Sequence, residues 1–255
     1  MELAGAVALV TGASRGVGRA IALALADAGA DVACAARATD DAPQKLPGTI
    51  DATVREVEAR GRRALAVPTD LSRPEQVEAM VATTVAAFGR LDVLVNNAAI
   101  TFAGDIALPM KRWDLVMDVN LRAPLLAIKA ALPGMIARRR GAILNVSSAA
   151  SVMPIPGLLV YGVSKAGLER LTTGLAEELR RHHIAVNCFR IDVPIASEGF
   201  VYNAPELDKS HWEPTEVGAE GALWMLAQPD GYTGRVVGIT DLRREHGVAR
   251  SRLQR

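Results

Sequence analysis

Short apolar runs alternate with stretches of helical periodicity along most of the chain. The runs at residues 6–10, 31–36 and 92–95 are almost wholly apolar, which is typical of strands buried on both faces of a sheet. In residues 168–179, leucines recur at intervals of three and four, so they share one face of a helix expected at 166–181. The same pattern gives further strands at residues 64–67, 142–146, 184–189 and 232–239, and further helices at 19–28, 51–60 and 214–226.

Two other helical stretches are defined by their ends. Ser72 with Glu75, and Pro74 between them, predicts a capping box at the start of a helix that ends at Phe88. Pro109 opens a longer helical region that ends at the arginines of residues 138–140, and Pro124 predicts a kink within it.

Strands and helices follow one another without an internal break. We therefore expect a single doubly wound, Rossmann-type α/β domain over residues 1–255, with a mostly parallel seven-stranded sheet flanked by helices. Residues 191–213 have no clear period, and loops of that length often act as lids, so we expect a substrate lid there. The polar, basic tail from Arg243 is expected to fray.

The first strand runs into the turn Thr11-Gly-Ala-Ser-Arg-Gly-Val-Gly18, which a helix follows. This order suits phosphate binding, because the N-terminus of a helix presents free N–H groups and a positive dipole end. Gly12 permits the tight turn, Gly16 lets the backbone approach a diphosphate, and Gly18 allows close packing of helix on strand. The spacing is G-x-x-x-G-x-G rather than G-x-G-x-x-G, so a purely structural turn is the alternative.

The second strand ends in Ala-Ala-Arg37, without the carboxylate that holds the ribose 2′-OH in NAD sites. We expect Arg15 and Arg37 to face the adenosine ribose, where two guanidiniums suit a 2′-phosphate better than a hydroxyl. NADP(H) is therefore the preferred cofactor and NAD(H) the alternative. Two solvated surface arginines are the structural alternative.

Polar residues also follow other predicted strands: Asp70, Asn97 and Ser148, with Tyr161 a little further on. In a parallel sheet the carboxyl ends of the strands share one edge, so these residues are expected to gather there. Tyr161 and Lys165 lie four apart, on one face of a helix. A fixed ammonium there would favour the tyrosinate and lower the phenol pKa from about 10 toward the range useful for proton transfer.

With these residues in place, the chain resembles the short-chain dehydrogenase/reductase superfamily over residues 4–240. The resemblance is carried by the glycine-rich turn, Asp70, Asn96-Asn-Ala-Ala99, Asn120, Ser148 and Tyr161-x-x-x-Lys165. Together these motifs are highly specific, although no one of them is specific alone.

The resemblance implies a role for each of four catalytic residues. Tyr161 would be the general acid/base, and Ser148 would polarise a substrate carbonyl. Lys165 would bind the nicotinamide ribose and lower the pKa of Tyr161, and Asn120 would hold a helix kink and a water of the proton relay. Cofactor contacts are implied for Gly12, Ser14, Arg15, Gly16, Val17, Gly18, Arg37, Asp70, Leu71, Asn97 and Ala98, together with Tyr161 and Lys165.

Two features depart from the family pattern. Members commonly carry Pro-Gly after the sixth strand, beside the nicotinamide, where this chain reads Arg190-Ile-Asp-Val-Pro194. Arg190 is expected to pack or face solvent, with an anionic substrate group as the alternative partner. The loop of residues 40–50 is also longer than a minimal member needs.

We expect an NADP(H)-dependent oxidoreductase that interconverts a carbonyl and a secondary alcohol. An NADP(H)-binding regulator with little turnover is one alternative, since fold does not fix function, and a dehydratase or epimerase on the same fold is another. A hydrophobic or medium-sized carbonyl compound is the expected substrate, because five apolar residues would make a largely apolar pocket wall, although they suit an ordinary core equally well: Ile100, Phe102, Met153, Ile155 and Leu158.

Charge and composition narrow the partners. The net charge of +1 gives no electrostatic case for nucleic acid or an anionic membrane, and charged residues interrupt the apolar stretches before they reach the length of a membrane span. Cys34 and Cys188 are expected to be buried free thiols in a reducing compartment, so we expect a soluble, cytoplasmic protein. The four histidines show no metal-ligand spacing. The resemblance implies a homotetramer or homodimer that pairs through the helices after Asn97 and Tyr161.

Overall fold

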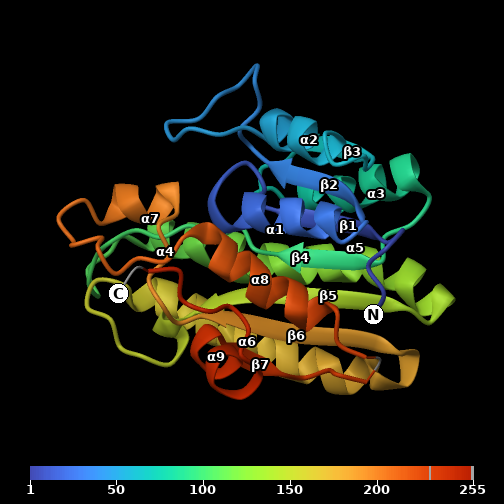
Figure 1. Ribbon diagram of the computed structural model, residues 1–255. Helices are drawn as coiled ribbons and strands as arrows, with labels where there is room; N and C mark the ends of the chain where they lie inside the picture. The colour runs from blue at the N-terminus through green and yellow to red at the C-terminus, as the bar shows by residue number, and fades with distance from the viewer. Residues whose placement is uncertain (230, 254–255) are drawn as a thin grey trace.

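A parallel sheet forms the centre of the computed structural model, which describes residues 1–229 and 231–253 (Figure 1). Within these residues the sheet has seven strands in the order β3-β2-β1-β4-β5-β6-β7, and every pairing is parallel. The strands are β1 (Val7–Thr11), β2 (Asp31–Ala36), β3 (Ala64–Pro68), β4 (Val93–Asn96), β5 (Gly141–Ser148), β6 (Ile184–Ile191) and β7 (Val236–Gly238). The expected doubly wound α/β class is confirmed.

Helices cover both faces of the sheet, as Figure 1 shows. One apolar core joins one face to α1 (Gly16–Asp27), α2 (Ile50–Glu58), α8 (Thr215–Leu226) and α9 (Ile239–His246). A second core joins the other face to α3 (Pro74–Phe88), α5 (Ala123–Arg138) and α6 (Leu159–Leu179). Two further α-helices are α4 (Met110–Met117) and α7 (Glu198–Asn203). The shorter helical turns are the π-helical η1 (Asp118–Arg122) and the 3-10 turns η2 (Ala149–Ser151) and η3 (Arg180–His182).

Two expected helix features differ in the structure. Ser72 forms no capping box, because its hydroxyl donates to Asp70 Oδ1 at 2.8 Å and α3 begins only at Pro74, after the N-cap Arg73. The break in the region after Pro109 is the π-turn η1, which ends at Arg122, two residues before Pro124. Pro124 has no N–H, so it cannot donate to the carbonyl of Asn120 four residues earlier, and the helix widens at this point.

The C-terminal region is more ordered than expected. The last strand is short, because the chain turns at Gly238 into α9, a helix where the sequence pattern predicts the end of a strand and a frayed tail. Arg243 pairs with the buried Glu213 at 2.8 Å, the backbone N–H of Arg252 donates to the same carboxylate, and Ala249 is buried. The expectation of a frayed tail is therefore wrong for the described residues.

None of the helices in the described residues is long and apolar enough to cross a membrane.

Candidate active site

The glycine-rich turn has the geometry that its sequence predicts. Gly12 and Gly16 have positive φ values of 70° and 57°, which strain any residue with a side chain. A Cβ on Gly18 would lie 2.3 Å from the carbonyl oxygen of Gly12, so only glycine fits where α1 meets β1. The N-cap residue Arg15 has an extended backbone, and its side chain does not cap the helix. The first N–H groups of α1 are therefore not bound by a capping side chain and can donate to an anion.

Thr11 ties the ends of β1 and β4 together. Its hydroxyl accepts the backbone N–H groups of Asn97 and Ala98, both at 3.1 Å, and donates to the carbonyl of Val95 at 3.3 Å. The Asn97 side-chain amide donates to the carbonyl of Thr11 at 2.9 Å. The motif predicts a place for Asn97 and Ala98 in the site but not this role of Thr11, although a hydroxyl residue at the end of a buried strand is a signal for it.

Arg15 and Arg37 do not act alike. The Arg15 guanidinium donates to the carbonyl oxygens of residues 46–48, at 2.7 to 3.2 Å, and so holds the long loop that follows β2. Burial lowers the pKa of Arg15; Glu198 opposes this and the charge of Arg37 adds to it, which places the two guanidiniums near each other. Arg37 is exposed and makes no hydrogen bond or ion pair with the described residues. Arg37 therefore has a guanidinium with free donors at the end of β2, and Arg15 keeps only its Nη1 donors free, since its Nε and Nη2 bind the loop. That both guanidiniums face a 2′-phosphate stays a prediction.

Asp70 follows β3 in a tight local turn. Its Oδ1 accepts the backbone N–H and the hydroxyl of Ser72, at 3.0 and 2.8 Å, while its own N–H donates to Gln76. Burial raises the pKa of Asp70, but the Ser72 hydrogen bonds and the charge of Arg37 outweigh it, and the pKa is lowered overall. The carboxylate therefore stays ionised. Leu71, the next residue, packs partly buried against the core.

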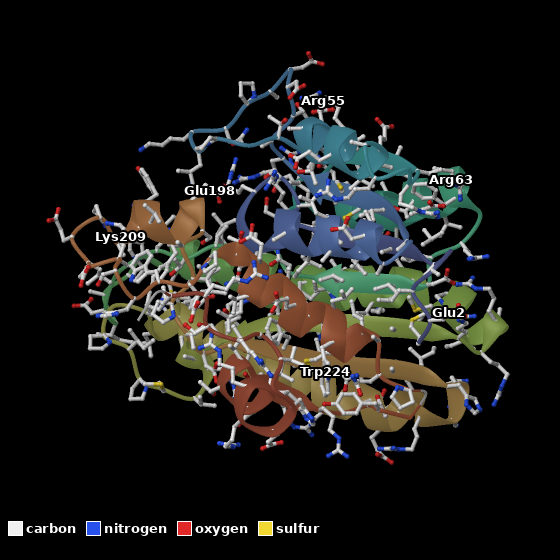
Figure 2. All side chains as sticks on the ribbon, viewed as in Figure 1. Glu2, Arg55, Arg63, Glu198, Lys209 and Trp224 are labelled. Carbon is white, nitrogen blue, oxygen red and sulfur yellow. The ribbon has the colours of Figure 1, made fainter. Side chains whose placement is uncertain are left out.

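The first turn of α7 covers the glycine-rich turn. A Cβ on Gly16 would lie 3.1 Å from Cβ of Ser197 and 3.5 Å from Oε2 of Glu198, a carboxylate oxygen that is buried and has no hydrogen-bond partner among the described residues. Figure 2 labels Glu198 at this position. Ser14 and Val17 are buried on the same turn. Residues 191–213 thus reach the place where the sequence predicts a diphosphate, and the role of this segment as a lid stays a prediction.

Asn120 is fully buried in η1 and braces it. Its Oδ1 accepts the N–H of Ile100, and its Nδ2 donates to the carbonyl of Ile100, both at 2.9 Å. Nδ2 also lies 3.1 Å from the hydroxyl of Ser164, which donates to the carbonyl of Tyr161 at 2.7 Å. This chain of contacts connects the π-turn to the segment that carries Tyr161.

Ser148, Tyr161 and Lys165 meet at the carboxyl end of β5. Ser148 is its last residue, and Tyr161 and Lys165 lie on α6, which begins before Tyr161 and not after it. Burial raises the pKa of Tyr161, and a hydrogen bond with Ser148 opposes this rise. The Lys165 ammonium donates to the carbonyl of Val146 at 2.7 Å and lies 5.6 Å from the centroid of the Tyr161 ring. The expected lowering of the Tyr161 pKa by Lys165 is therefore wrong for these contacts, where burial dominates.

After β6, where the chain lacks the Pro-Gly of the family pattern, Asp192 binds the start of α9. The Asp192 carboxylate accepts the backbone N–H of Thr240 at 3.1 Å and also the Thr240 hydroxyl, at the start of α9. A Cβ on Gly238 would lie 2.2 Å from Asp192 Oδ2, so glycine at this position makes room for the carboxylate. A carboxylate at a helix N-terminus also meets the positive end of the helix dipole.

Exposed apolar side chains surround this edge of the sheet. They come from the β4–α4 connection, the start of α4, the β5–α6 connection and residues 191–213, and include Ile106, Met110, Val152, Met153, Phe200 and Leu207. Of the residues expected to line a pocket, Met153 and Ile155 are exposed, whereas Ile100 and Phe102 pack against a small buried cluster. The two cysteines are buried free thiols, as expected, and the described residues hold no group of acidic, histidine and cysteine side chains suited to a metal ion.

The chain matches the family model described as short chain dehydrogenase over residues 6–193. It is 36% identical over 251 residues to the hydroxysteroid dehydrogenase-like protein 2 of Danio rerio, and covers 60% of that relative, so the chain spans about three-fifths of its length. Among solved structures, it is similar to a metagenomic short-chain oxidoreductase in complex with NADP, with 35% identity, a TM-score of 0.78 and coverage of 93% and 97% of the two chains. A blue fluorescent protein from a metagenomic library, in complex with NADPH, gives 33% identity, a TM-score of 0.79 and the same coverage.

The chain therefore belongs to the short-chain dehydrogenase family of oxidoreductases.

Proposed function

We propose that the protein is an NADP(H)-dependent oxidoreductase that interconverts a carbonyl and a secondary alcohol. The observation that carries this proposal is the meeting of Ser148, Tyr161 and Lys165 at the same sheet edge as the glycine-rich turn. The glycine-rich turn fits a dinucleotide, because Gly18 lets α1 pack closely on β1 and the N-terminus of α1 then presents its first N–H groups to a diphosphate. A bound nicotinamide supplies or accepts the hydride.

The protein groups then handle the proton and the charge. When hydride reaches a carbonyl carbon, negative charge develops on the substrate oxygen, which needs a proton donor and a hydrogen-bond donor. Tyr161 gives the proton in reduction and takes it in oxidation, and Ser148 donates a hydrogen bond to the same oxygen. Lys165 holds the nicotinamide ribose and supplies positive charge beside the phenol. Asn120, whose carbonyl lacks its usual helical donor, holds a water of the proton relay.

Arg37→Ala is expected to weaken NADPH binding by about 10- to 100-fold and NADH binding by less than about 3-fold, because a charge-assisted contact to phosphate contributes about 1.5–3 kcal/mol. Dissociation constants for both coenzymes, measured by fluorescence titration at fixed salt, test this. Arg73→Ala, a nearby arginine at the α3 N-cap, is the matched control. Equal losses for the two coenzymes would refute the phosphate assignment.

The substrate has a bulky apolar body, since exposed apolar side chains from three segments border the site. A panel of ketones and secondary alcohols of increasing apolar size, followed with NADPH or NADP⁺, tests the proposal as a whole. Stereospecific hydride transfer to the product supports it. Tight NADPH binding without turnover would favour a regulator, and a product without net redox change would favour a dehydratase or epimerase.

We also infer a homodimer or homotetramer. An open groove of about 570 Å³ lies between η1, α5 and α6, lined by apolar residues that include Leu121, Leu125, Leu171 and Leu175. Leu168 and Leu179 point instead into the core, so the leucine pattern of α6 serves both surfaces. Light scattering gives the mass in solution. A cytoplasmic location stays a prediction.

A further inference from the structure

A partly buried ion pair lies next to the candidate catalytic residues, one helical turn after Lys165 on α6. Glu169 follows Lys165 by four residues on α6, as Lys165 follows Tyr161, so the three share one face of the helix. Both oxygens of Glu169 accept from the Arg190 guanidinium, at 2.9 and 2.7 Å, and the two side chains are only 13% and 18% exposed. Arg190 lies on β6 and is the first residue of the stretch Arg190-Ile-Asp-Val-Pro194, where members of the family commonly have Pro-Gly.

The same carboxylate fixes the residues on both sides of Ser148. Oε1 of Glu169 accepts the hydroxyl of Ser147 at 2.7 Å and lies 2.6 Å from the hydroxyl of Ser151. The Ser151 hydroxyl also lies 2.8 Å from the carbonyl of Ser148, and donates its one proton to one of these oxygens at a time. Arg190 is paired in register with Ser147 across β5 and β6. One carboxylate thus joins β5, η2, α6 and β6 around Ser148.

Glu169 is also the anion that acts on Lys165 at neutral pH. The titratable groups that act on Lys165 are Glu169 on α6 and Cys188 on β6, and the Tyr161 ring lies beside it on α6. β5 contributes the Val146 carbonyl, and Arg190 on β6 is paired with Glu169. Burial lowers the pKa of Lys165 to about 8, and negative charge on Cys188 or Glu169 opposes this. Burial raises the pKa of Cys188 to about 12, so its thiol is neutral at pH 7 and Glu169 remains.

We propose that Glu169 and Arg190 are a positioning pair for the active site, in which Glu169 holds Ser148 in place and keeps the Lys165 ammonium charged. This rests on the proposed function, because Ser148 and Lys165 are placed there. Stability alone does not require charged residues at these two positions, because apolar residues can often replace a poorly exposed ion pair without loss of stability.

The two members of the pair should shift the pH profile in opposite directions. Glu169→Gln removes negative charge beside Lys165, so Lys165 loses its proton more easily, and the alkaline limb of kcat/KM moves to lower pH. Arg190→Gln removes a neighbouring cation and leaves Glu169 charged, so the limb moves to higher pH. At pH 7, Glu169→Gln is expected to lower kcat/KM by about tenfold, within the range for coupled neighbours. Glu177→Gln, on the same helix in an exposed pair with Arg180, is the control that leaves the profile unchanged.

A readout without turnover separates this proposal from the proposed function. The unfolded chain binds a proton at Lys165 more tightly than the folded chain, so between about pH 8 and the unfolded pKa the free energy of unfolding rises with pH. Lys165→Met has no titrating side chain at this position and should lack this increase. The free energy of unfolding of the parent minus that of Lys165→Met, measured across the pH range, therefore gives the part that is due to Lys165. In the Glu169→Gln background the rise should begin at lower pH.

Each outcome has one meaning. If the rise begins at lower pH but no carbonyl compound turns over, the Glu169–Lys165 coupling stands and the proposed function fails. If turnover is present but neither variant that folds moves the alkaline limb or the rise, the pair is structural only and this inference is overturned. Either variant suffices should the other not fold, because each has its own predicted direction.

Discussion

Tyr161→Phe is expected to lower kcat by about 10²- to 10⁴-fold, the usual contribution of a positioned general acid or base, while leaving dinucleotide binding within about twofold of the parent. The change removes one oxygen from a half-buried ring and keeps its packing on α6. The hydroxyl bonds to Ser148 and lies at the sheet edge beside the glycine-rich turn, so its loss removes the proton and little else.

Steady-state kinetics on a ketone substrate and fluorescence titration with NADPH measure the two quantities. Tyr232→Phe is the matched control, because it removes the same atom from a tyrosine that packs edge-on against Trp224. Parent-like turnover in Tyr161→Phe would remove Tyr161 from the chemistry.

Gly18→Ala is expected to abolish measurable dinucleotide binding and to lower the free energy of unfolding by about 1–3 kcal/mol or more, as overpacking does. The added Cβ would lie 2.3 Å from the Gly12 carbonyl and 2.4 Å from the Asn97 amide nitrogen, and the Gly12 contact is to backbone that cannot swing aside. Relief of the clash must separate α1 from β1, which opens the turn that faces the diphosphate.

Denaturant unfolding and NADPH titration test this prediction. Gly134→Ala in α5 is the control, because its Cβ would meet only the flexible end of Arg138 at 3.3 Å, and alanine is the better helix former by up to about 1 kcal/mol. An alanine at residue 18 with parent-like binding would show that the turn does not cradle the cofactor.

Local chemistry made part of this site predictable from the sequence. The strand at residues 31–36 matches β2 residue for residue, since a buried parallel strand is a plain apolar run, and the glycines of the turn are each required by the backbone there. The carboxyl ends of parallel strands then gather Asp70, Asn97 and Ser148 without further information.

Tertiary contacts decided the rest. Nothing local in the sequence shows that the Arg15 guanidinium is held by a loop about thirty residues away, or that Glu169 and Arg190 pair across α6 and β6. The last helix was missed because Gly238 ends a strand and begins a helix at one residue, so the apolar positions of β7 and α9 merge into one run.

The contact between Asp192 and the start of α9 has a practical consequence for engineering. A chain shortened before Ile239 would leave that carboxylate without Thr240 and without a helix dipole, as an uncompensated charge at the end of β6. Libraries that redesign the end of β6 should therefore vary Asp192, Gly238 and Thr240 together, because a favourable residue at one of these positions depends on the size and charge of the other two.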